Sequence, residues 1–192
     1  MHLKDGILFF LEKYLKGLVM KKSSLFFTAV TSAVISCAAL AADGTINFTG
    51  SIIDTACTVD AASANQTVKL GTVAASSFSS AGATAGAARF SINLTGCPAA
   101  VKTASVRFDG PVPSGNSSVL SLSSGQTATN LAVGLYQVDS TTLIPIGSST
   151  PSVPLTTSGT NTLVFIAKYY ALSTPVGAGT ANANATFTVA YN

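Results

Sequence analysis

Two cysteines, Cys57 and Cys97, are the residues of this 192-residue chain whose spacing most clearly points to a chemical bond. The third cysteine, Cys37, lies in an apolar stretch near the N-terminus, and the single histidine is His2. An isolated pair of thiols forms a disulfide in an oxidising compartment, whereas a metal site would need further soft ligands. If the chain is exported, we expect a Cys57–Cys97 bond whose loop contributes on the order of 3 to 4 kcal/mol to stability.

The N-terminal region indicates export. Residues 20–41 have the three parts of a secretory signal peptide, namely the basic Met20-Lys21-Lys22, the apolar run from Leu25 to Ile35 and the small-residue site Ala39-Leu40-Ala41. We predict cleavage before Ala42 and interpret residues 1–19 as an upstream extension from a start codon assigned too early.

Two other processing routes stay open beside cleavage. The uncharged run 23–42 is just long enough to span a membrane. Residues 34–37 loosely resemble a lipobox, in which Cys37 would carry a lipid. The basic start and the alanine cleavage site favour the cleaved signal, so we expect no stable membrane anchor.

The composition of the mature chain excludes several kinds of function. Without residues 1–41 it keeps five basic and five acidic side chains, so its formal charge is zero and indicates no nucleic acid partner. It has no His, Glu or Trp, and its five Asp are scattered singly. An imidazole base and histidine metal ligands are therefore missing, and we expect no enzyme, cofactor or metal site.

Short segments of strand character cover almost the whole mature chain. The expected strands are residues 52–59, 67–73, 89–95, 105–109, 119–122, 131–138, 143–146, 163–172 and 186–191, with one possible helical turn near 74–78. Gly82, Gly86, Gly177 and Gly179 are interpreted as turn and linker glycines. Short strands at this spacing favour one antiparallel sandwich of about 150 residues.

Both ends of the mature chain alternate between apolar and polar residues, which is typical of a strand with one buried face. The N-terminal face consists of Ile46, Phe48, Gly50 and Ile52, and the C-terminal face of Phe187, Val189 and Tyr191. A strand without an evident neighbour in its own domain indicates pairing with another chain. Residues 46–52 as a first strand of their own sandwich, and 186–191 as an ordinary terminal core strand, remain alternatives.

Four stretches of the sequence together resemble the type 1 fimbrial major subunits, or pilins, of the chaperone–usher class. They are residues 45–50, residues 54–60 around Cys57, residues 90–97 and residues 181–191. The cysteine spacing, the penultimate Tyr191 and Gly179, fourteenth from the C-terminus, are the most specific elements. The resemblance covers residues 42–192.

This resemblance implies an all-β fold: an incomplete immunoglobulin-like sandwich, preceded by a signal peptide, that a donor strand from a neighbouring subunit completes. It also implies that a periplasmic chaperone fills the groove first and that the next subunit replaces it at an outer-membrane usher, an established form of strand addition. Residues 42–55 are then the donor-strand extension and residues 56–192 the pilin domain. The donor residues are Ile46, Phe48, Gly50 and Ile52, and those for chaperone and C-terminal strand recognition are Gly179, Phe187, Val189 and Tyr191.

The function that follows is a structural subunit in the shaft of an extracellular adhesive fimbria, which supports cell adhesion and biofilm formation. Its expected partners are identical or related pilins, the chaperone and the usher. A minor or adaptor pilin and a secreted β-sandwich binding module are the alternatives.

Overall fold

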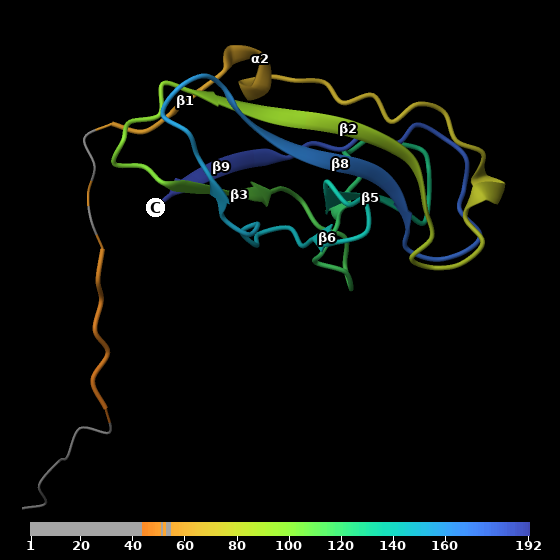
Figure 1. Cartoon of the computed structure of the whole chain (residues 1–192). Helices are drawn as coiled ribbons and strands as arrows, with labels where there is room; N and C mark the ends of the chain where they lie inside the picture. Colours follow the sequence, from red (N-terminus) through yellow and green to blue (C-terminus); the bar gives the residue numbers. More distant parts are fainter. Residues whose placement is uncertain (1–43, 51, 53–54) are drawn as a thin grey trace, which may run out of the picture. The chain divides into compact units, whose positions relative to one another are not determined.

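The computed structural model describes residues 44–50, 52 and 55–192 (Figure 1). The predicted signal peptide, the cleavage site before Ala42 and the lipobox at Cys37 lie outside these residues. Within this part of the chain, a search for helices that could span a bilayer finds none of sufficient length and hydrophobicity. The described residues before Gly50 and those from Gly50 onward belong to two separate units.

The second unit consists of two antiparallel sheets. The larger sheet has the strand order β1 (Thr58–Val59), β2 (Thr84–Thr95), β8 (Asn161–Ala171), β5 (Leu131–Gln137) and β4 (Leu120–Ser121), and β6 (Leu143–Ile144) also pairs with β5. The smaller sheet has the order β7 (Val153–Pro154), β3 (Thr103–Asp109) and β9 (Thr186–Tyr191). Only α2 (Ala61–Ala64) and the 3-10 turn η1 (Ala75–Ser77) are helical among the described residues.

The core lies between the two sheets because successive side chains of a strand point to opposite faces. Ile92 and Leu94 on β2 are fully buried, as is Val106 on β3. Three phenylalanine rings join the sheets: Phe108 of β3 packs edge-to-face on Phe165 of β8 at 5.0 Å and on Phe90 of β2 at 6.0 Å. Aromatic pairs in this arrangement stabilise a core beyond the apolar area that they bury.

Most of the predicted strands are confirmed, and two are wrong. Residues 186–191 form β9 with the predicted bounds, and the hairpin from β5 into β6 turns at 138–142 as expected. Residues 52–59 form only the two-residue β1 in their described part, and residues 67–73 form no strand at all. Residues 67–73 do alternate as a strand does, with Val68 and Leu70 packed on the core, but no strand in the described part of the chain pairs with them.

One glycine predicted to lie in a turn lies inside a strand instead. Gly86 has a φ of 69° within β2, where the register with β8 shifts between Ala85 and Ala88. A side chain there would also lie 2.9 Å from the carbonyl oxygen of Leu70. Gly86 is therefore a β-bulge that lets residues 67–73 pass close over the sheet.

Candidate functional site

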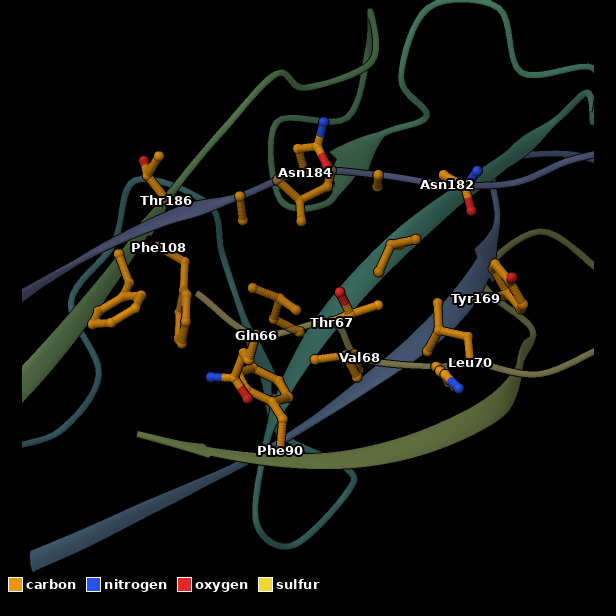
Figure 2. A pocket seen from close by; sticks show the side chains of 18 of the residues that line it. Gln66, Thr67, Val68, Leu70, Phe90, Phe108, Tyr169, Asn182, Asn184 and Thr186 are labelled. Carbon is orange, nitrogen blue, oxygen red and sulfur yellow. The ribbon is translucent and has the colours of Figure 1, made fainter. Parts of the chain in front are cut away.

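A groove of about 690 Å³ opens along one side of the sandwich (Figure 2). Residues 66–71 form one rim and residues 181–187 the other, and the groove exposes part of the core between them. Phe90, Phe108 and Tyr169 line its interior together with aliphatic side chains from β4, β5 and β8. An apolar groove between two extended segments has the form of a vacant strand position in the sandwich.

The first rim has no backbone partner. Thr67 to Val73 take part in no backbone–backbone hydrogen bond among the described residues. The side chain of Gln66 bonds instead to the carbonyl oxygen of Ser91 at 3.1 Å, which ties the start of the rim to β2. Extended backbone whose N–H and C=O groups have no protein partner is a template for pairing, so this rim can accept a strand.

The second rim is paired on one side only. The backbone N–H of Asn182 donates to Gln126 Oε1 at 2.9 Å, and its carbonyl accepts from the Ser123 N–H at 2.8 Å. Ala183 to Ala185 take part in no backbone–backbone hydrogen bond within the described part of the chain. Extended backbone directs successive residues to opposite sides, so the groups on the other side of this rim are free to accept a strand.

Strand β9 continues the second rim and is an edge of its sheet. Among the described strands it pairs with β3 alone, from Thr186↔Asp109 to Tyr191↔Ala104. Phe187, Val189 and Tyr191 are half-buried and pack against the core, so the structure places on one face the C-terminal residues that the sequence grouped there. Of these three, Phe187 lines the groove.

The predicted disulfide between Cys57 and Cys97 is present. Both cysteines are buried, and Asn161 Nδ2 donates to Cys97 Sγ at 3.5 Å. The bond closes the loop that contains residues 66–71, so it anchors both ends of the chain segment that carries the first rim. Tyr191 Oη donates to the carbonyl oxygen of Cys57 at 3.4 Å, which joins the last strand to the same region.

The residues predicted for the donor strand are exposed. Ile46, Phe48 and Ile52 have 78%, 91% and 100% of their surface accessible. Residues 44–50 form no strand, and a Cβ added at Gly50 would meet no atom within 4 Å. Three large apolar side chains in one exposed segment are typical of a binding element rather than of a core strand.

Gly179 lies just before the second rim and does not line the groove. A Cβ there would overlap the backbone N of Ala128 and the Oγ1 of Thr127, so the residue is a glycine of close backbone approach and not simply a linker. No group of His, Cys, Asp or Glu that could hold a metal occurs among the described residues. The arrangement has the chemistry to bind an extended apolar segment by adding a strand.

The fold and the groove define an all-β immunoglobulin-like sandwich with a vacant strand position, as expected from the sequence. A P pilus rod subunit shares this fold, with a TM-score of 0.57 and 22% identity over 72% of this chain and 100% of its own. An antigen and type I fimbria protein of Burkholderia pseudomallei is 40% identical, with a TM-score of 0.56 over 77% of this chain and 97% of its own.

Comparison with related sequences indicates the family of the chain. The profile of the family described as Fimbrial protein matches residues 46–192. The type-1 fimbrial protein A chain of Escherichia coli K12 is 38% identical over 84% of this chain and 90% of its own length. The fimbrial subunit type 1 of Klebsiella pneumoniae is 38% identical over 90% and 100%. The chain therefore belongs to the fimbrial protein family, and it is a structural subunit of an extracellular fimbria.

Alkaline pH is expected to loosen the C-terminal strand. Burial raises the pKa of Tyr191, so the folded state favours the neutral phenol. This contribution to stability is complete below the ordinary tyrosine pKa of about 10 and is lost as the pH rises through the folded value. Burial, and then the neighbouring Tyr170, also raise the pKa of Tyr136.

A pH series of denaturant unfolding between roughly pH 8 and 11.5 checks this expectation. Because Tyr136 still titrates, the Tyr191→Phe variant should still lose some stability at alkaline pH. Its free energy of unfolding should fall less steeply with pH than that of the wild type. Equal slopes for the two proteins would show that Tyr191 makes no such contribution.

Proposed function

We propose that the chain forms the shaft of an adhesive fimbria by donor-strand exchange, in which residues 46–52 of one subunit enter the groove of the next. The observation that carries this proposal is an apolar groove between one rim with no backbone partner and a second rim that is paired on one side only. The same chain also has an exposed alternating apolar segment. A strand in the groove would gain backbone partners on both sides and cover the exposed core.

The large side chains of the donor segment are apolar, as is the interior of the groove. Ile46, Phe48 and Ile52 would each contribute roughly 1.5 to 3 kcal/mol when fully buried. Part of this gain is offset by the cost of ordering the segment and of association. Gly50 would then lie where the acceptor backbone comes too close for a side chain, which explains a glycine inside an otherwise good strand.

A subunit on its way to the fimbria needs a cover for its groove, because unpaired strand edges and exposed apolar surface promote aggregation. We propose that a periplasmic chaperone supplies this cover along β9 and that an outer-membrane usher is the place of exchange. The proposed contacts of this chain with the chaperone are Phe187, Val189 and Tyr191. The C-terminal segment that carries them begins at Gly179. Residues 20–41 would be the signal peptide, residues 42–55 the donor extension and residues 56–192 the acceptor domain.

Deletion of Tyr191 and Asn192 should weaken chaperone binding at least about tenfold, because β9 loses its half-buried terminal ring and the bond to Cys57. Co-purification with the chaperone gives the binding, and the fraction with an oxidised Cys57–Cys97 pair gives the folding. Tyr191→Phe is the matched control, since it keeps the ring. Full chaperone binding by the truncated chain would contradict a recognition role for this end.

Protein sheared from the cell surface tests the proposed function as a whole. Unboiled gels in SDS should show an ordered ladder of oligomers that collapses on heating, because each joint is a folded and kinetically stable strand exchange. Mass spectrometry of the monomer should give a start at Ala42 and a mass two hydrogens short of the reduced chain. A lone monomer in the medium, or a lipid on Cys37, would instead support a secreted binding module.

A further inference from the structure

The second rim of the groove is anchored to residues 123–130 by a series of hydrogen bonds. The backbone bonds are Gly177 N–H to Thr129 O at 3.0 Å, Thr129 N–H to Gly177 O at 3.3 Å, Ala128 N–H to Thr180 O at 3.1 Å and Ser123 N–H to Asn182 O at 2.8 Å. Side chains add Thr180 N–H to Thr127 Oγ1 at 2.9 Å and Asn182 N–H to Gln126 Oε1 at 2.9 Å. We call residues 123–130 and 177–182 the rim anchor.

Two glycines of the rim anchor have no room for a side chain. A Cβ at Gly177 would overlap Oγ1 of Thr129 and would lie 3.3 Å from its Cβ and 3.5 Å from its backbone N. A Cβ at Gly179 would overlap the backbone N of Ala128, which no side-chain truncation can relieve. A methyl group at position 179 must push the two segments of the rim anchor apart, because the atom that it overlaps belongs to the backbone. A methyl group at position 177 requires either a turn of the Thr129 side chain or the same separation of the segments.

The rim anchor ends where the groove begins. Thr180 and Asn182 point their backbone groups toward residues 123–128, so the alternation of extended backbone turns those of Ala181 and Ala183 the other way. Ala181 and Ala183 line the groove. A shift of the rim would misalign its N–H and C=O groups with an incoming strand, and hydrogen bonds weaken steeply once they are misaligned. The rim therefore accepts a strand only while the anchor holds it in place.

We propose that Gly177 and Gly179 are positioning residues for donor-strand uptake, which set the place of the second rim by letting it lie directly on residues 127–129. The inference rests on the proposed function, because it concerns how the same groove receives its strand. By this inference, residue 179 must be a glycine because of its contacts within this chain, and not because it contacts a chaperone.

The experiment uses the whole mature subunit with its disulfide formed, and a fluorescent peptide of residues 42–55 as the donor. Gly177→Ala should weaken peptide binding at least about tenfold. Thr129→Ala is the reference for the double variant, since it keeps the backbone bonds to Gly177 and removes an Oγ1 that takes part in none of the hydrogen bonds of the described residues. The double variant Gly177→Ala/Thr129→Ala should recover to within about threefold, because the overlapping atom is gone.

Two further variants separate positioning from general loss of fold. Gly179→Ala should bind as weakly as Gly177→Ala, and Thr127→Ala should not rescue it, because the overlap there involves backbone. Ala178→Ser, between the two glycines and exposed, is the matched control and should bind like the wild type. The unfolding midpoint of each variant is measured in parallel, and the peptide affinity should fall further than the folded fraction does.

Each outcome decides the matter. If Gly177→Ala binds the peptide as the wild type does, or loses affinity only in proportion to its folded fraction, the positioning role is overturned and the proposed function is not affected. Failure of the double variant to recover also overturns it. If the wild type itself does not bind the peptide, the proposed function fails and the inference with it.

Discussion

Gly50→Val should abolish polymerisation and leave the fold of the subunit intact. In its own chain Gly50 has open space around it, since a Cβ there would meet no atom within 4 Å, so valine costs little in the monomer. In the groove of a neighbour the same valine would lie where the donor backbone approaches the acceptor most closely. The unboiled ladder should disappear, while the thermal midpoint of the isolated subunit should change by less than about 2 °C.

The matched control is Thr49→Val, which places the same side chain on the opposite face of the predicted donor strand. This variant should polymerise normally, because its face does not enter the groove. A ladder of normal length from Gly50→Val would contradict the assignment of residues 46–52 as the donor. Loss of the ladder in both variants would point to a general effect of valine on the segment.

Replacement of both cysteines should have the largest effect on stability. Cys57 and Cys97 are separated by 40 positions, and a loop of that size contributes on the order of 3 to 4 kcal/mol. The same loop carries the rim 66–71, so the Cys57→Ala/Cys97→Ala variant should lose both stability and donor uptake. Denaturant unfolding of the mature subunit measures the first effect, and binding of the donor peptide the second.

The wild type treated with a reductant is the control for the double cysteine variant, since it keeps both side chains but breaks the bond. The two proteins should unfold at similar denaturant concentrations. A free energy of unfolding within about 1 kcal/mol of the oxidised wild type would show that the disulfide contributes little here.

The sequence predicted best those strands in which apolar and polar residues alternate clearly and whose partner strand belongs to the same chain. Strand β9 was predicted with its bounds, because Phe187, Val189 and Tyr191 alternate strictly and β3 gives them a partner. Strand β2 extends further toward the N-terminus than predicted, since its alanine-rich start has little contrast between faces. The short helix α2 was missed, although the side chain of Asp60 caps it by accepting from the Ala62 N–H.

The groove itself could be predicted only in part. Residues 67–73 were predicted to form a strand, and this was wrong, because the alternation that packs Val68 and Leu70 on the core does not reveal whether a strand lies beside them. The close-packing roles of Gly86 and Gly179 could not be predicted from the sequence either. Each depends on a close approach by a segment far away in the chain, Leu70 in one case and residues 127–128 in the other.

The most direct test of donor-strand exchange is to find where Phe48 lies in the assembled fimbria. A photo-reactive phenylalanine analogue replaces Phe48, intact fimbriae are irradiated, and the cross-linked species are separated after boiling and sequenced by mass spectrometry. We predict heat-resistant dimers in which position 48 is joined to residues 66–71 or 181–187 of a second subunit, the two rims of the groove. Cross-links only within one subunit, or to surfaces away from the groove, would contradict the account.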